Sequence, residues 1–166
     1  KILDNQEYKN IKFSLSQDGK TIVVQRLNRK DPANFGLWVI KENGNLEPLN
    51  NKPGGEFLIA PDSQTIAMSQ GEGVAILPLE QNAEPIDFLS QFGQVMTFSR
   101  DGKLAAMVNF NTQDIDLRYT RSLYLVTNQG QENKLLDTNG SIIDCKFNPS
   151  ATKLYCLLSS LIETSE

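Results

Sequence analysis

The chain has 166 residues, of which 39% are hydrophobic and 22% charged, a balance typical of one globular domain and not of a disordered or fibrous protein. The formal net charge is −4, from 16 basic and 20 acidic residues spread along the chain, which argues against a nucleic-acid partner. The longest apolar runs reach only about six residues, whereas a membrane-spanning helix needs roughly 20, so we expect no membrane span. The sequence opens at Lys1 without an initiator Met, which indicates an excised segment with any signal peptide upstream.

A repeated segment organises the chain. Residues 13–24 (FSLSQDGKTIVV) recur as 57–68 (FLIAPDSQTIAM), as 96–107 (MTFSRDGKLAAM) and, in degenerate form, as 145–156 (CKFNPSATKLYC). The central residues of the four copies are 18, 62, 101 and 150, so the spacings are 44, 39 and 49. Spacings of this size are typical of one propeller blade per repeat.

Each copy predicts a β-hairpin: an alternating apolar strand, a tight Asp-Gly or Ser-Ala turn, and a second alternating strand. Folding about the turn places the residue five before the central one opposite the residue six after it, with a second pair nearer the turn on the same face. The resulting column is apolar in all four copies, and we expect it to pack on the next blade. The outer pairs are Phe13–Val24, Phe57–Met68, Met96–Met107 and Cys145–Cys156, and the inner pairs are Leu15–Ile22, Ile59–Ile66, Phe98–Ala105 and Phe147–Leu154.

Two further strands are predicted after each of the first three hairpins, over 36–40 and 46–49, 73–77 and 85–89, and 122–126 and 133–136. Only residues 159–166 follow the fourth hairpin, and Ile2-Leu3 adds one short strand before the first. We therefore expect an all-β fold, residues 1–166 forming one domain of three complete four-stranded blades and a partial fourth, a fragment of a larger propeller.

An open blade exposes an apolar face and strand edges. We expect a second copy of the chain, as a homodimer, or missing sequence to cover the open ends.

The hairpin Phe13-Ser-Leu-Ser-Gln-Asp-Gly-Lys20, followed by Leu37-Trp-Val-Ile40 and Asn43-Gly44, resembles the TolB-type, WD-repeat-like β-propeller family. The resemblance covers nearly the whole chain and implies the propeller fold. It also implies a periplasmic or extracellular location, because TolB-like proteins work in the periplasm. Its blades occur in non-catalytic scaffolds and in the gating propellers of prolyl-oligopeptidase-like hydrolases, so the resemblance leaves the function open.

The sequence contains no His, which excludes Ser-His-Asp and Cys-His catalysis and the His-Glu-x-x-His zinc motif. No phosphate-binding glycine loop is present either. We expect no catalytic residue and no cofactor. Cys145 and Cys156 share the apolar column, which favours a buried apolar pair; a cross-strand disulfide is the alternative. The oxygen-rich run 109–116 offers calcium ligands but lacks the Gly and terminal Glu of a calcium loop, so we expect no metal.

Two long charged loops are predicted at one end of the blades, the end that also carries the connections between blades; the Asp-Gly turns lie at the other end. Charged and aromatic side chains on loops of a rigid scaffold are typical of recognition sites. We therefore expect a protein or peptide partner at loops 28–35 and 110–121, against the alternative that both loops are ordinary surface insertions. The candidate contact residues are Arg29, Lys30, Asp31, Asp114, Asp116, Arg118, Tyr119 and Arg121.

Overall fold

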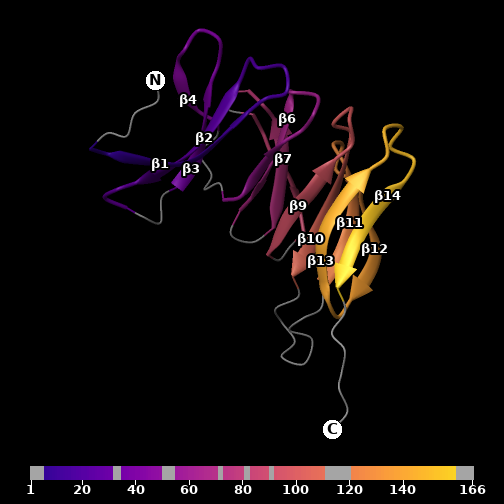
Figure 1. Cartoon of the computed structure of the whole chain (residues 1–166). Coiled ribbons are helices and arrows are strands. Elements are labelled where there is room, and N and C mark those ends of the chain that lie inside the picture. The colour runs from indigo at the N-terminus through magenta and orange to yellow at the C-terminus, as the bar shows by residue number, and fades with distance from the viewer. Residues whose placement is uncertain are drawn as a thin grey trace.

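The computed structural model describes residues 6–31, 35–49, 55–70, 73–80, 83–89, 92–110 and 121–159. Within these ranges all regular structure is β, in four separate antiparallel sheets that follow the chain and lie side by side (Figure 1). The predicted all-β blade architecture is confirmed. The predicted strand at Ile2-Leu3 lies outside the described residues.

Three sheets have four strands each and one has two, and in every sheet the strands are ordered as in the sequence. Blade 1 contains β1 (Tyr8–Leu15), β2 (Ile22–Asn28), β3 (Phe35–Ile40) and β4 (Leu46–Pro48). Blade 2 contains β5 (Phe57–Ile59), β6 (Thr65–Ser69), β7 (Val74–Pro78) and β8 (Ile86–Phe88). Blade 3 contains β9 (Gly93–Phe98), β10 (Leu104–Phe110), β11 (Arg121–Thr127) and β12 (Glu132–Thr138), and blade 4 contains β13 (Ser141–Phe147) and β14 (Leu154–Ser159).

This strand order gives the blades two distinct ends. We call the end with the four hairpin turns the turn face. The opposite end, which carries the β2–β3 and β10–β11 connections and the links between blades, we call the connection face. Because neighbouring strands are antiparallel, alternate loops must emerge at opposite ends, as the sequence predicted.

The predicted hairpin register is confirmed at every pair but one. Phe13 lies opposite Val24, Phe57 opposite Met68, and all four inner pairs form as expected. The exception is Met96, because a β-bulge shifts the register so that Met107 pairs with Val95 instead. A bulge inserts one unpaired residue into a strand, which regular alternation does not anticipate.

In blades 2, 3 and 4 the apolar column packs on the preceding blade, and not on the next one as predicted. Phe57 and Met68 of blade 2 form a core with Val23 and Leu37 of blade 1. Two equivalent cores join blades 2 and 3 and blades 3 and 4. The hydrophobic core is therefore divided into layers, one between each pair of neighbouring blades.

Cys145 and Cys156 form a disulfide, which corrects the preference for a buried apolar thiol pair. The two residues are direct cross-strand partners, and their Cα atoms are only 4.1 Å apart. Side chains of directly opposed residues lie on the same face of the sheet, so the two sulfur atoms are within bonding reach. The predicted position of the two residues opposite each other is confirmed.

The hairpin turns of blades 1, 2 and 3 are held by the Asp side chain at the central position of the repeat. In blade 1 the Asp18 carboxylate accepts hydrogen bonds from the Ser16 hydroxyl (2.6 Å) and the Lys20 amide (3.0 Å). These bonds lower the pKa of Asp18, with the Ser16 hydroxyl as the main cause. The next residue has a positive φ in all four turns, at Gly19, Ser63, Gly102 and Ala151.

Candidate functional site

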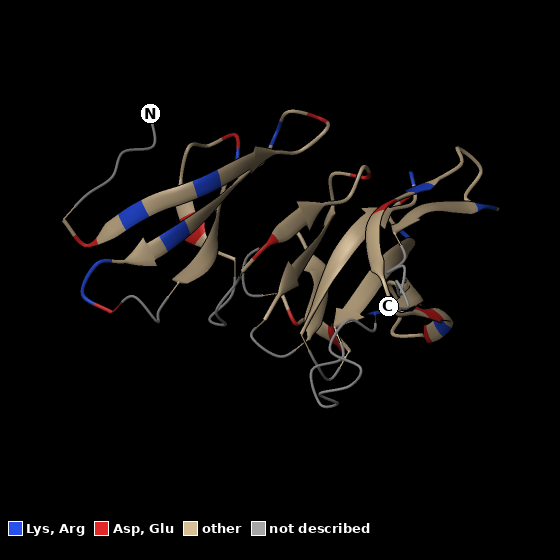
Figure 2. Ribbon diagram, turned by 60° about the horizontal axis from the view of Figure 1, so that its bottom comes forward, with Lys and Arg blue, Asp and Glu red and all other residues tan. Residues whose placement is uncertain are grey.

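The blade 1 part of the connection face presents three charged residues, Arg29, Lys30 and Asp31, directly after β2. All three are exposed, and Figure 2 shows basic and acidic residues side by side at this end of β2. The Asn28 side-chain oxygen accepts hydrogen bonds from the backbone amides of Lys30 (2.9 Å) and Asp31 (3.3 Å). An Asx turn of this kind fixes the backbone, so the charged side chains start from a defined position.

The blade 3 part of the connection face is built around the start of β11. The Arg121 guanidinium lies 4.6 Å from the centre of the Phe110 ring, across the two strand ends from which the long loop emerges. Next to it, the Asp137 carboxylate pairs with Lys134 at 2.7 Å and accepts a hydrogen bond from Ser122. Lys134, followed by Ser122, lowers the pKa of Asp137, so this carboxylate is charged at neutral pH.

Residues 32–34 of the first loop and 111–120 of the second, including Asp114, Asp116, Arg118 and Tyr119, lie outside the described residues. The described parts, Arg29 to Asp31 and Arg121, lie on blades 1 and 3 with blade 2 between them.

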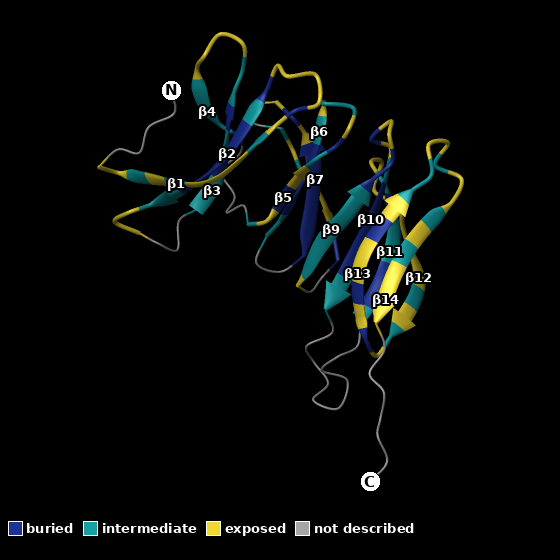
Figure 3. Cartoon of the chain, in the orientation of Figure 1, coloured by how far each residue is buried: buried dark blue, intermediate teal, exposed yellow. Residues whose placement is uncertain are grey.

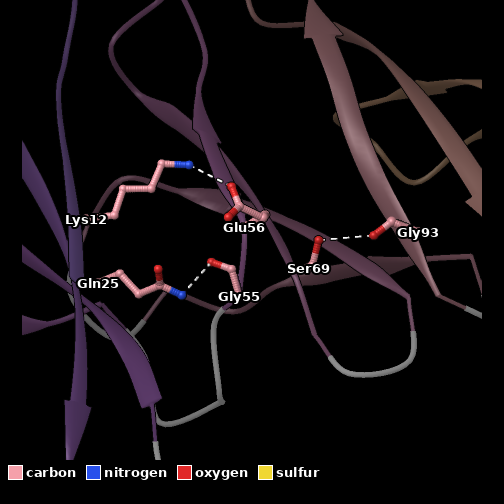
Figure 4. A network of polar contacts seen from close by, with 6 residues as sticks. All are labelled: Lys12, Gln25, Gly55, Glu56, Ser69 and Gly93. Atoms are coloured by element: carbon pink, nitrogen blue, oxygen red, sulfur yellow. Dashed lines mark hydrogen bonds and ion pairs between the residues drawn. The ribbon is translucent and has the colours of Figure 1, made fainter. Parts of the chain in front are cut away.

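Two polar contacts that the sequence analysis missed fix the spacing of blades 1, 2 and 3 near the connection face (Figure 4). The Gln25 side chain donates a hydrogen bond to the Gly55 carbonyl (3.1 Å), and the Ser69 hydroxyl donates one to the Gly93 carbonyl (3.0 Å). Gln25 and Ser69 occupy the same place in the repeat, seven residues after the central one. A polar residue recurring on an otherwise apolar strand face was the available signal.

A third contact between blades joins the innermost strands. Lys12, just before the apolar column of blade 1, pairs with Glu56 of blade 2 at 2.6 Å (Figure 4). Both residues lie six before the central residue of their repeats. Side chains at this position in neighbouring blades are therefore within ion-pairing distance of each other.

The described ranges contain no group of three or more His, Cys, Asp or Glu side chains placed to hold a metal ion. No helix in them is long and apolar enough to cross a membrane. The exposed guanidinium, ammonium and carboxylate groups of the connection face suit ion pairing and hydrogen bonding with another molecule.

The sequence matches no protein-family model and no curated protein. Solved structures do resemble the fold. An oligogalacturonate lyase in complex with manganese superposes with a TM-score of 0.66 at 12% identity, covering 90% of this chain and 47% of the lyase. A TolB protein from Agrobacterium tumefaciens gives 0.61 at 15% identity, covering 92% of this chain and 61% of TolB.

Peptidase structures are similar too. The acylaminoacyl peptidase of Pyrococcus horikoshii gives a TM-score of 0.58 at 16% identity, and the match covers 81% of this chain and 26% of the peptidase. The chain thus spans less than two thirds of the length of each of these proteins. At such low identities the likeness shows the β-propeller fold alone, and a fold shared by a lyase, a peptidase and TolB does not define an activity.

Proposed function

We propose that this chain is a non-catalytic β-propeller module that binds a protein or peptide partner through its connection face. The observation that carries the proposal is the exposed triplet Arg29, Lys30 and Asp31, whose backbone is fixed by the Asn28 side chain. Side chains that are held in place before binding lose less conformational entropy when they engage a partner. Arg121 and the ionised Asp137 add charges of both signs at blade 3.

We further propose a periplasmic or extracellular location. The resemblance to TolB-type repeats supports it, and so does the Cys145–Cys156 disulfide, because disulfides persist in oxidising compartments and are rare in the cytosol. The test is thiol alkylation of freshly lysed cells of the native host. Both cysteines should resist alkylation until a reductant is added, and immediate labelling would argue for a cytosolic protein.

Site-specific photo-crosslinking tests the binding face. Benzoylphenylalanine is placed at Arg29 or Lys30, and at Lys20 or Lys103 on the turn face as matched controls, since all four are exposed basic residues. We expect both connection-face positions to give the same adduct from the host's envelope and secreted fraction, and excess unlabelled chain to abolish it. Equal adducts from both ends, or adducts from the turn face alone, would contradict the proposed site.

Two charge-reversal double variants test the binding face a second time. Arg29→Glu with Lys30→Glu should weaken partner binding at least about tenfold, because each lost charged contact is worth about 1 kcal/mol or more. Lys20→Glu with Lys103→Glu changes the net charge equally and should leave binding unchanged. If both double variants weaken binding equally, overall charge and not the connection face is responsible.

The second candidate function is the accessory propeller of a larger hydrolase, and the likeness to acylaminoacyl peptidase favours it. The reading frame in the host genome discriminates the two. A Gly-x-Ser-x-Gly segment and a downstream His in the same frame would favour the hydrolase. Under either proposal the chain alone has no turnover, so hydrolysis by the purified chain that a connection-face substitution abolishes would refute both.

A further inference from the structure

A lysine side chain closes the junction between blades 1 and 2 at the turn face. Lys41, which follows β3, is half-buried, and its ammonium group donates a hydrogen bond to the Leu79 carbonyl of blade 2. Leu79, which follows β7, is 4% exposed and packs in the core between the two blades. At this place one blade therefore binds an ammonium group at the end of an aliphatic chain.

The junction between blades 2 and 3 has other residues at the same place. Pro78 of blade 2 is equivalent to Lys41, since each comes directly after the residue that pairs with the position four after the central one. Asn128 of blade 3 is equivalent to Leu79, since the backbone amide of each donates to the carbonyl two after the central residue, at 3.0 and 2.7 Å. Proline carries no ammonium group, and Asn128 is exposed. The second junction therefore lacks the side chain that fills this place in the first.

A hollow of about 330 Å³ lies at this place. Its lining is apolar at Ile76, which is 3% exposed, and at Ile86 and Pro78, and Asn128 lines it from blade 3. Figure 3 shows β7 largely buried and the turns at this end of the blades exposed. Blades 2 and 3 each have a neighbouring blade on both sides, and Glu84 is the charged residue of the lining. The volume is at the lower end of the range of about 300–1,000 Å³ that small-molecule sites have.

Three polar groups around the hollow are hydrogen-bond acceptors. Glu84 has an exposed carboxylate, and Asn128 has the carbonyl equivalent to the one that Lys41 bonds in blade 2. The Thr65 hydroxyl donates its proton to the Asp62 carboxylate at 2.8 Å, so toward the hollow it can only accept. An anionic ligand would lie beside Glu84 and be repelled, whereas a cation that donates hydrogen bonds is favoured.

We infer that the hollow binds a small molecule that carries a primary alkylammonium group. The ammonium group pairs with the Glu84 carboxylate and donates to the Asn128 carbonyl, in the way that Lys41 donates to Leu79. The alkyl chain lies on the isoleucine side chains, which removes apolar surface from water. The net charge of −4 attracts cations over anions. The inference is independent of the proposed partner, because the hollow lies near the turn face and the proposed partner binds at the opposite end.

Titration of the isotope-labelled full chain with n-butylamine, followed by NMR, tests the inference. Butylamine is charged at neutral pH and matches the side chain of Lys41 from its Cβ atom outward. We expect saturable shifts at the amides of β7, β8 and Asn128, with a dissociation constant of about 0.1–1 mM for one exposed ion pair and a short chain. 1-Butanol, which has the same chain without the charge, should bind at least about fivefold more weakly. Absence of saturation at about 10 mM butylamine, shifts confined to other strands, or equal binding of the two molecules would overturn the inference.

Glu84→Gln removes the charge of the site and keeps the size of the side chain. It should weaken butylamine binding about three- to tenfold, because the ammonium group loses its ion pair. Glu42→Gln, in the corresponding turn of blade 1 and likewise exposed, changes the net charge equally and should leave the affinity unchanged. If the two variants have the same affinity, the Glu84 carboxylate is not the partner of the ammonium group and the inference is wrong.

Pro78→Lys gives blade 2 the residue that blade 1 has at this place. The new side chain should enter the hollow and donate to the Asn128 carbonyl, so butylamine should no longer bind. Pro78→Ala, which cannot fill the hollow, is the matched control and should keep the affinity within about threefold of the wild type. Circular dichroism checks that both variants fold. If Pro78→Lys binds butylamine as tightly as Pro78→Ala does, the hollow is not the binding site and the inference is wrong.

Discussion

Replacing Gly102 by Ala should destabilise the protein much more than the same change at Gly19, although both glycines follow the Asp of an Asp-Gly turn. Both have left-handed φ values, +69° and +75°. Their surroundings differ. A Cβ on Gly19 meets nothing within 4 Å, whereas a Cβ on Gly102 would overlap the carboxylate of Asp62 from the neighbouring turn, only 2.5 Å from its Cγ.

The magnitudes follow from this difference. An Ala in the left-handed region costs about 1 kcal/mol relative to Gly, and that is the whole expected effect at position 19. At position 102 the Asp62 carboxylate must also move, although it is held by the amides of Gln64 (2.9 Å) and Thr65 (3.0 Å) and by the Thr65 hydroxyl (2.8 Å). Losing one such charge-assisted bond costs a further ~2 kcal/mol, so we expect about 3 kcal/mol in total.

Urea denaturation at fixed protein concentration measures both values, and an unchanged m-value would show that only stability has changed. A double-mutant cycle isolates the contact: in an Asp62→Ala background, Gly102→Ala should cost no more than Gly19→Ala. Equal costs for the two single variants, or no coupling between positions 62 and 102, would refute the reasoning that the two turns press against each other.

Three further predictions concern the turns and the disulfide. Cys145→Val with Cys156→Val keeps the apolar column but opens a cross-link between residues 11 apart, so urea denaturation should show a loss of about 3 kcal/mol; dithiothreitol should destabilise the wild type and leave this variant unchanged. Asp18 and Asp101 have pKa values lowered from the usual 3.8, mainly by Ser16 and Ser99, so their contribution is complete above about pH 4 and is lost as the pH falls through the folded pKa. Asp18→Asn should therefore be less stable than wild type at pH 7, and the difference in stability should shrink as the pH falls below about 4; a pH-independent difference would contradict this. Ala151 has a φ of 55°, so Ala151→Gly should increase the free energy of unfolding by about 0.5–1 kcal/mol and raise the thermal midpoint; an unchanged or lower midpoint would contradict this.

The sequence predicted the fold well because its dominant signal is local. An apolar column around an Asp-Gly turn fixes the register of a hairpin without reference to the rest of the molecule, and Phe13–Val24 and Phe57–Met68 pair accordingly. The predicted pairing of Met96 with Met107 is wrong because a bulge adds one residue to β9, and regular alternation does not reveal a bulge.

The candidate site was less predictable. Arg29 and Arg121 lie on the connection face, as the alternation of loops between the two ends of the blades predicted. The sequence pattern does not show that the Asn28 side chain bonds the backbone of the first loop. It also does not show that Asp137 pairs with Lys134 and Ser122. For Gln25 and Ser69 the sequence holds a signal, a polar residue on an otherwise apolar strand face, but it does not identify the backbone carbonyl that each side chain bonds.

The layered core determines which blades unfold first. Each layer is shared by two adjacent blades only, so cooperativity passes from neighbour to neighbour as in a linear array, and blades with one covered side should open first. Ile66, Met68, Leu77 and Met107, all fully buried, lie on the two central blades. Amide hydrogen exchange should accordingly be slowest in β6, β7 and β10 and faster in β1 and β14.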